Sequence, residues 1–230
     1  MRPTVLLFDI DGTLITTGGV GRRAIERAFF EQHGRDDACS SFPFDGMTDR
    51  LIARRALDAI GVPVTDAAID AVLALYVKRL AEEVERAGDD RYRLHDGIPE
   101  ALRAARSRGH GIGLGTGNVR EGARIKLERL GVYEEFAFGG FGCDAEDRTE
   151  LIRRGAERGA AHLGRPLDAC RVVVIGDTPK DVAAARGIGA ESIAVATGSF
   201  SVEALRESGA TYTYTSLAAP GALAVLLDGA

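Results

Sequence analysis

The chain has 230 residues, of which 45% are hydrophobic and 27% are charged, so it can bury a sizeable core. This balance excludes a disordered or fibrous protein. The net charge of −5 argues against non-specific binding to nucleic acid, which attracts basic surfaces. We therefore expect no nucleic acid as a macromolecular partner.

Cysteine usage and apolar stretches bear on the compartment. Cys39, Cys143 and Cys170 are too few, and odd in number, for a disulfide framework, and their spacing matches no zinc pattern. The longest apolar stretch, around residues 217–227, is short and interrupted by Pro220-Gly221. Asp9 also comes too early for a signal peptide. We expect a cytoplasmic protein that does not enter a membrane.

Strand-like and helical patterns alternate along most of the chain. Runs rich in apolar and β-branched residues predict strands at Val5–Phe8, Gly111–Gly115, Phe136–Phe138, Val172–Ile175, Ser192–Ala196 and Thr211–Tyr214. Helical periodicity between them predicts helices at Pro99–Arg108, Glu121–Leu130, Glu150–Leu163, Pro179–Arg186 and Val202–Glu207. This alternation predicts an α/β fold with a doubly wound parallel sheet, a Rossmann-like core.

The stretch after the first strand breaks this alternation. Helical patterns cover Arg22–His33, Asp49–Ile60 and Asp66–Ala87, with no convincing strand among them. Glycine and small polar residues at 16–19 and 88–90 are typical of hinges. We therefore expect a core made of residues 1–16 and 92–230, and an inserted helical domain over residues 17–91.

Two carboxylates follow the first predicted strand. Val5–Phe8 leads directly into Asp9-Ile10-Asp11-Gly12-Thr13. Ionised carboxylates beside a core cost several kcal/mol unless they are paired or bound to a cation, which favours a metal-assisted reaction centre. The alternative is a turn in which Asp9 and Asp11 act as caps and Gly12 supplies an unusual backbone angle.

Two further predicted strands end in polar residues. Thr116-Gly117-Asn118 closes one strand, and Gly176-Asp177-Thr178-Pro179-Lys180-Asp181 follows another. Ligands of open parallel sheets bind outside the carboxyl ends of the strands. Asp181 and Asn118 also have the spacing of helix-capping residues, with Thr178 and Glu121 respectively, so both interpretations stay open. Asp177 resembles Asp9 in following a continuous apolar run, and one metal ion held by both would neutralise them.

These motifs, in this order, resemble those of the haloacid dehalogenase superfamily. The motifs are Asp9-Ile10-Asp11-Gly12-Thr13, Thr116 and Gly176-Asp177-Thr178-Pro179-Lys180-Asp181. The chain is most similar to the phosphoglycolate-phosphatase-like branch, in which a helical cap is inserted after the first strand. The resemblance covers essentially the whole length.

The resemblance implies a Mg²⁺-dependent phosphatase that forms an aspartyl-phosphate. Asp9 is expected to be the nucleophile and Asp11 the acid and base, a task that requires the pKa of Asp11 to rise above about 3.9. The implied metal ligands are the Asp9 carboxylate, the Asp11 backbone carbonyl, Asp177 and Asp181. The expected phosphate-binding residues are Gly12, Thr116, Gly117, Asn118 and Arg148.

Arg148 stands where the family usually has a lysine. Asp147 can cap a helix with Glu150 at its third position, which puts Arg148 in a first turn, where a cation is disfavoured by about 0.3–1 kcal/mol. Because of this penalty we favour a functional role, in which Arg148 would orient phosphate and pair with the nucleophile. The alternative is an exposed surface arginine. Lysine occurs only three times in the chain, and Lys126 and Lys180 are the fallback candidates.

The expected substrate is a small phosphorylated metabolite, with phosphoglycolate among the possibilities. Residues 45–50 form the best candidate for a cap loop that contacts substrate, although Thr48 or Asp49 can equally cap a helix there. Basic residues of the insert that could meet an anionic substrate are Arg22, Arg23, Arg54 and Arg55.

Other functions of the same fold need separate consideration. The family's sugar phosphomutases share an acid/base residue like Asp11, whereas its dehalogenases lack one. A phosphoryl-accepting switch is a non-enzymatic alternative. A dinucleotide-dependent oxidoreductase is excluded because the glycines at 109–117 never form G-x-G-x-x-G.

Overall fold

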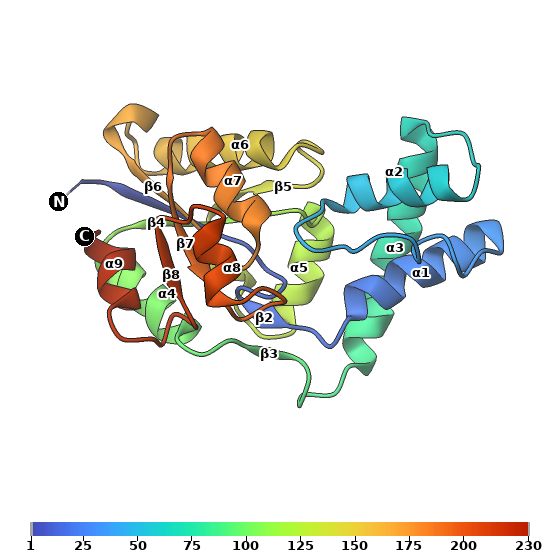
Figure 1. Ribbon diagram of the computed structural model, residues 1–230, viewed down its shortest axis with the longest axis horizontal. Coiled ribbons are helices and arrows are strands. Elements are labelled where there is room, and N and C mark those ends of the chain that lie inside the picture. The colour runs from blue at the N-terminus through green and yellow to red at the C-terminus, as the bar shows by residue number, and fades with distance from the viewer. Residues whose placement is uncertain (1, 230) are drawn as a thin grey trace.

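A parallel sheet organises the computed structural model, which describes residues 2–229 (Figure 1). Within these residues, the sheet has six strands in the order β5-β4-β1-β6-β7-β8. They are β1 (Thr4–Phe8), β4 (Gly111–Thr116), β5 (Phe138–Phe141), β6 (Arg171–Gly176), β7 (Glu191–Val195) and β8 (Tyr212–Tyr214). From β1 the chain adds β4 and β5 on one side and then β6, β7 and β8 on the other, so the predicted doubly wound α/β fold is confirmed.

Helices cover both faces of the sheet. The core helices are α4 (Ile98–Ser107), α5 (Arg120–Glu128), α6 (Arg148–His162), α7 (Pro179–Gly187), α8 (Val202–Glu207) and α9 (Ala222–Asp228), with short 3₁₀ turns at Tyr133–Glu135 and Leu167–Ala169. Alternate residues of β1 point to opposite faces. Val5 and Leu7 pack with α6 and α7, whereas Leu6 and Phe8 share a cluster with α4 and α9. All four β1 side chains are fully buried.

The register of β1 sets the position of the acidic residues. Phe8 is aligned with Leu114 of β4 and Ile175 of β6. The residues that follow each strand therefore emerge at one edge of the sheet. The pairing of β1 with β6 thus places the segment that contains Asp9 beside the segment that contains Asp177.

The strand β5 lies later in the chain than predicted. The expected Phe136–Phe138 is wrong, because β5 covers Phe138–Phe141 and Phe136 ends the preceding 3₁₀ turn. The sequence of β5 is Phe-Gly-Gly-Phe, which has low strand propensity. The close approach of α6 requires Gly140, because a Cβ there would lie 1.8 Å from the carbonyl oxygen of Leu151.

A helical segment lies beside the sheet domain, at the right of Figure 1. It contains α1 (Val20–His33), α2 (Asp49–Ala59) and α3 (Asp66–Arg86), close to the predicted helices. α3 packs against α1, α2 and the core helix α5. The chain enters and leaves this segment through a two-stranded antiparallel ribbon, β2 (Ile15–Thr16) with β3 (Arg93–Leu94), which the sequence did not predict.

The apolar C-terminal stretch forms α9, an amphipathic helix that packs against α4 and was not predicted. Across residues 2–229, none of the helices combines the length and the apolar character needed to traverse a lipid bilayer. The cytoplasmic location expected from the sequence stays a prediction.

Replacing Gly140 with alanine tests the close approach of α6 to β5. The added methyl group would overlap the Leu151 carbonyl, so Gly140→Ala should lower the free energy of unfolding by about 1–3 kcal/mol. Gly122→Ala is the matched control, because its Cβ would find only ordinary contacts at 3.5 Å and beyond and the change raises helix propensity in α5. Urea unfolding of both variants measures the difference, and equal stabilities would contradict the packing described.

Candidate active site

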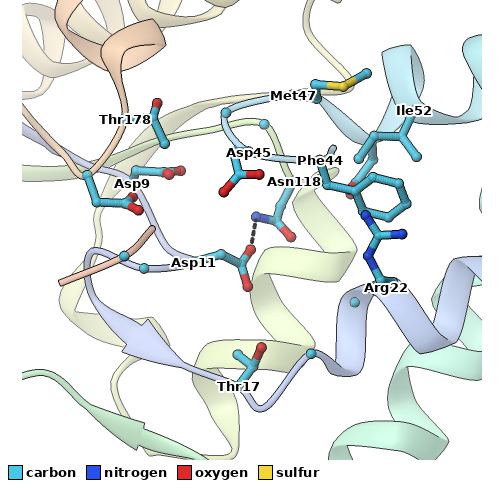
Figure 2. A pocket seen from close by; sticks show the side chains of 18 of the residues that line it. Asp9, Asp11, Thr17, Arg22, Phe44, Asp45, Met47, Ile52, Asn118 and Thr178 are labelled. Atoms are coloured by element: carbon cyan, nitrogen blue, oxygen red, sulfur yellow. Dashed lines mark hydrogen bonds between the residues drawn. The ribbon is translucent and has the colours of Figure 1, made fainter. Parts of the chain in front are cut away.

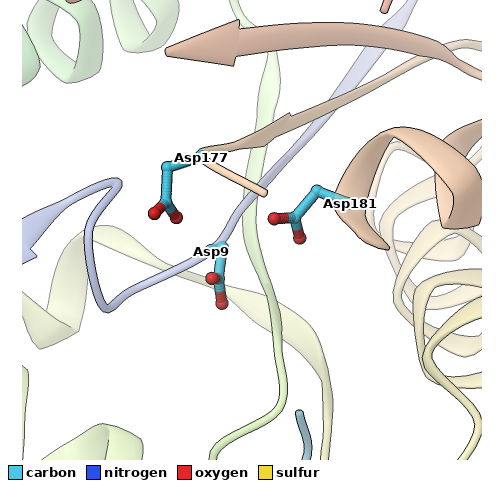
Figure 3. Close-up of side chains that lie close together, drawn as sticks. All are labelled: Asp9, Asp177 and Asp181. Carbon is cyan, nitrogen blue, oxygen red and sulfur yellow. The ribbon is translucent and has the colours of Figure 1, made fainter. Parts of the chain in front are cut away.

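Three buried carboxylates converge at the carboxyl edge of the sheet (Figure 3). Asp9 follows β1, Asp177 follows β6, and Asp181 lies in the first turn of α7. Each residue offers a carboxylate oxygen, and these oxygens lie within 4.8 Å of one another. They are close enough to bind one hard cation that prefers oxygen ligands.

Small residues make room for this cluster. Gly12 has a φ of 81°, and a Cβ there would lie 2.3 Å from Oδ2 of Asp177. Gly198, in the loop after β7, approaches the same carboxylate even more closely. Two threonines hold the arrangement: Thr13 Oγ1 donates to Asp177 Oδ1 at 2.9 Å, and Thr197 Oγ1 donates to the Gly12 carbonyl at 2.6 Å.

Arg148 is the cation of the cluster. It opens α6, where Asp147 caps the helix by accepting the Glu150 N–H, as predicted. Its buried guanidinium lies 3.1 Å from Asp9 Oδ2 and 2.5 Å from Asp181 Oδ1. Asp181 in turn completes the predicted capping box of α7 with Thr178. One planar group with several N–H donors thus connects the end of β1 to the start of α7.

The pKa values of two carboxyl groups in the cluster, Asp9 and Asp177, are raised. Burial, opposed in part by Arg148, raises the pKa of Asp9 to about 6. Burial and the nearby charges of Asp181 and Asp9 raise the pKa of Asp177 to about 8. A bound divalent cation would remove this repulsion and favour the ionised forms. The donor set therefore fits the divalent cation that the sequence implied.

Asp11 lies in a different environment from Asp9. Its Oδ2 accepts hydrogen bonds from Lys126 Nζ at 2.6 Å and from Asn118 Nδ2 at 2.9 Å, and Figure 2 shows Asp11 and Asn118 facing each other. Burial alone would raise the pKa of Asp11, but the charge and hydrogen bond of Lys126, with that of Asn118, outweigh it and lower the pKa. The expectation of a raised pKa is therefore wrong for the unliganded protein.

The loop after β4 carries Thr116, Gly117 and Asn118. Thr116 is fully buried, and its Oγ1 accepts hydrogen bonds from the backbone and side-chain nitrogens of Asn118. Asn118 is not the helix cap, because Val119 occupies that position of α5. Gly117 lies against α2, where its carbonyl accepts the Asp49 N–H at 2.8 Å and a Cβ would meet the Met47 carbonyl.

A cavity of about 340 Å³ joins these groups to the helical segment (Figure 2). Its volume is at the small end of the range for ligand sites. The sheet side contributes the polar groups, among them Asp9, Asp11, Asn118, Lys126, Arg148 and Asp177. The helical segment contributes the apolar and aromatic side chains Ile25, Phe44, Met47, Ile52 and Tyr76, together with the polar residues Thr17, Arg22, Asp45 and Asp49.

A comparison with protein families bears on what this site is. The model of the haloacid dehalogenase-like hydrolases matches residues 3–189, which include Asp9, Asp11, Arg148, Asp177 and Asp181. The chain belongs to this family. The predicted hydrolase and the predicted superfamily are thereby confirmed.

Solved structures of similar fold span the whole chain of this haloacid dehalogenase-like hydrolase. CbbY from Rhodobacter sphaeroides, solved in complex with phosphate, is 20% identical with a TM-score of 0.73, covering 99% of this chain and 100% of that one. A putative phosphoglycolate phosphatase from Lactobacillus delbrueckii is 22% identical with a TM-score of 0.68 and the same coverage. A putative β-phosphoglucomutase from Thermotoga maritima is 23% identical with a TM-score of 0.61, covering 97% and 98%. No curated protein matched the chain.

The residues that the sequence singled out divide into two groups in this hydrolase. Lining the cavity are Asp9, Asp11, Gly12, Gly117, Asn118, Arg148 and Asp177, whereas Thr116 and Asp181 lie behind it. Of the two fallback lysines, Lys126 reaches Asp11, and Lys180 instead donates to the Asp45 carbonyl at 2.7 Å. Their chemical roles stay predictions.

In the predicted cap loop the helix-capping function is confirmed for Thr48, and the substrate contact stays a prediction. Thr48 caps α2 by accepting the Leu51 N–H, and residues on either side of it line the cavity. Arg22 also lines the cavity, with its guanidinium 3.8 Å from the centroid of the Phe44 ring. Arg23 and Arg54 pair with glutamates, and Arg55 lies over the ring of Phe42.

Several residues around the site were missed from the sequence. Thr197 and Gly198 follow β7, so applying the strand-end rule to a further predicted strand would have found them. Asp49 was considered in the sequence only as part of the cap loop and as a possible helix cap, and its contact with the loop after β4 was not predicted. Its carboxylate is buried and accepts the Val119 N–H at 2.8 Å, and burial, opposed in part by Lys126, raises its pKa to about 6.

The raised pKa values predict how metal binding depends on pH. Below about pH 6 to 8, Asp9 and Asp177 hold protons that a cation must displace, so Mg²⁺ affinity should rise with pH and level off above about 8. The rise should approach tenfold per pH unit for each proton released. Calorimetry in two buffers of different ionisation enthalpy counts these protons. Asp177→Asn should bind more weakly and with a shallower pH dependence; a pH-independent affinity without proton release would contradict the assignment.

Proposed function

We propose that this hydrolase is a Mg²⁺-dependent phosphatase that hydrolyses a small phosphate monoester through an aspartyl-phosphate on Asp9. The observation that carries the proposal is the position of Asp9. Its buried carboxylate lies beside the Arg148 guanidinium and the Asp177–Asp181 pair, at the wall of a cavity that Asp11 also lines. This arrangement provides a nucleophile, positive charge for a phosphoryl group and a second carboxylate within one small space.

The first step is attack by a carboxylate oxygen of Asp9 on phosphorus. A bond from Asp9 to phosphorus forms, the bond from phosphorus to the alcohol oxygen breaks, and the alcohol leaves with a proton from Asp11. Mg²⁺, held by Asp9, Asp177, Asp181 and the Asp11 carbonyl, would reduce repulsion between the nucleophile and the phosphate dianion. Arg148 compensates the charge of Asp9 and donates to phosphoryl oxygens.

The second step is hydrolysis of the acyl phosphate. Asp11 takes a proton from water, the water oxygen attacks phosphorus, and the bond to Asp9 breaks, which regenerates the carboxylate. Despite burial, the charge and hydrogen bond of Lys126 lower the pKa of Asp11, which favours its ionised form. Binding of a phosphate dianion beside it favours uptake of the proton needed in the first step, because a nearby negative charge raises a carboxyl pKa.

The remaining predicted residues complete the phosphate site. Gly12 and Gly117 line the cavity without side chains that would block a phosphoryl group, and backbone N–H groups near them are assigned to bind its oxygens. Thr116 and Asn118, which bond each other, are assigned to the same site. Residues 17–91 act as the cap: they cover the carboxyl edge of the sheet, exclude water and contact the leaving group through the apolar wall of the cavity.

Replacing the nucleophile tests the proposal directly. Asp9→Asn should abolish both phosphoenzyme formation and hydrolysis of 4-nitrophenyl phosphate with Mg²⁺. The variant should remain folded, because the change removes a charge from a buried, mutually repelling cluster. Circular dichroism checks the fold, and substantial turnover by the folded variant would overturn the assigned nucleophile.

The same assay separates the phosphatase from its alternatives. Many turnovers per chain, with release of inorganic phosphate, support the phosphatase. One phosphate retained on each chain supports a phosphoryl-accepting switch. With a sugar phosphate, recovery of the phosphate at a different position of the same sugar supports a mutase. A panel of phosphorylated metabolites then identifies the substrate.

Arg148 provides a second, independent test. Arg148→Ala leaves Asp9 and Asp181 buried without their cation, so kcat/KM should fall by about 10²–10³-fold. Arg154→Ala is the matched control: this arginine lies in the same helix but is exposed and pairs with Glu150, so its loss should leave kcat/KM unchanged. If the two variants have equal kcat/KM, the proposed role of Arg148 in catalysis is wrong and its role is structural.

A further inference from the structure

Lys126 is a buried cation that the proposed mechanism does not use. Its side chain is 3% exposed, although lysine is almost never buried unless it is paired. Its ammonium group lies 2.6 Å from Asp11 Oδ2 and 2.6 Å from Asn118 Oδ1. The helix that carries it is also fixed, because Tyr92 OH donates to the Lys126 carbonyl at 2.7 Å.

The two partners of this ion pair are exposed to different extents. The Asp11 side chain is 43% exposed and extends into the cavity, whereas Lys126 is enclosed behind it. A surface pair would leave both groups in water, and a core pair would bury both. Here Lys126 is the buried partner, and Asp11, whose carboxylate it binds, faces the cavity.

Both hydrogen bonds to the Asp11 side chain go to the same oxygen. Oδ2 accepts from Lys126 and from Asn118, and Asn118 is itself held by Lys126 and Thr116. We call Asp11, Lys126 and Asn118, which are hydrogen-bonded to one another, the Asp11 triangle. These bonds fix the plane of the Asp11 carboxylate. Among the bonds formed by residues 2–229, they leave Oδ1 of Asp11 as the oxygen available to a leaving group or water.

The helical segment closes over the Asp11 triangle. α1 approaches so closely that a Cβ on Gly21 would lie 3.3 Å from Lys126 Nζ. Such an approach excludes water from the ammonium group, and an ion pair strengthens when water is excluded. The contact with Asp11 is therefore protected by the segment that we assign as the cap.

We propose that Lys126 is a positioning residue that holds Asp11 with its free oxygen directed at the leaving-group oxygen of the substrate. This inference depends on the phosphatase mechanism proposed above, in which Asp11 passes its proton to the alcohol oxygen as the bond from that oxygen to phosphorus breaks. Lys126 acts through Asp11 and does not contact phosphorus. Displacing a catalytic group by about 1 Å can cost about 10²-fold in rate, so the tether has a measurable effect.

Leaving groups of different quality distinguish this role from a structural one. 4-Nitrophenolate is a stable anion and departs with little help from an acid, whereas an alkoxide needs a proton. Lys126→Met should therefore lower kcat for an alkyl phosphate such as glycerol 2-phosphate by about 10²–10³-fold, and for 4-nitrophenyl phosphate by less than about tenfold. Lys78→Met, an exposed lysine on α3, should leave both values unchanged.

A double variant shows whether Lys126 acts through Asp11. In an Asp11→Asn background, adding Lys126→Met should change kcat for the alkyl phosphate by less than about threefold, because the group being positioned is already lost. Circular dichroism and thermal unfolding check the fold of each variant. If Lys126→Met does not fold, Lys126→Gln, which keeps a donor without the charge, is used in the same comparison.

Each outcome decides between the proposals. An inactive wild-type protein on both substrates, with Mg²⁺ present, overturns the phosphatase function. An active wild type with equal losses on the two substrates in Lys126→Met, or with no loss, overturns the positioning role and leaves the phosphatase standing. A selective loss on the alkyl phosphate that disappears in the Asp11→Asn background supports it.

Discussion

Mutual repulsion among three buried carboxylates is the constraint on which this structure depends. Asp9, Asp177 and Asp181 come together because β1 and β6 are parallel neighbours and α7 begins directly after β6. One guanidinium, that of Arg148, is shared by Asp9 and Asp181, so negative charge remains in excess. Burial, together with the nearby charges of Asp181 and Asp9, raises the pKa of Asp177 to about 8. Such a site costs free energy of folding, and a divalent cation bound there would offset that cost.

This charge imbalance also explains why an arginine suits position 148. The guanidinium is planar and has donors on more than one nitrogen, and Arg148 uses them to contact carboxylates from two elements. A lysine ammonium is a compact charge, so it would have to lie between the carboxylates of Asp9 and Asp181 to contact both. The departure from the family's usual lysine is therefore compatible with the geometry, because the cation still lies beside Asp9. Of the three lysines in the chain, Lys126 pairs with Asp11 instead.

Features encoded by adjacent residues could be predicted, and features that depend on distant segments could not. The apolar runs before Asp9 and Asp177 located two strand ends, and the Asp147 cap located Arg148 at the start of α6. The strand β5 was misplaced because its two glycines lower its strand propensity, and one of them, Gly140, is required by the helix packed on it. The shift in the pKa of Asp11 was predicted in the wrong direction. Its partner Lys126 is 115 residues away in the sequence, and only the packing of α5 brings it to Asp11.

The two catalytic carboxylates proposed here are two residues apart in the chain, yet they are controlled by different parts of the fold. Asp9 is held within the sheet domain by Arg148 and by its own acidic neighbours. Asp11 is held by Lys126 and Asn118, and the loop that carries Asn118 is bonded on both sides to Asp49 of α2. Because Asp49 belongs to the helical segment, movement of that segment would change the loop beside Asp11 while leaving Asp9 in place. The fold thus places the proposed nucleophile within the sheet domain and the proposed proton-transfer group at its junction with the helical segment.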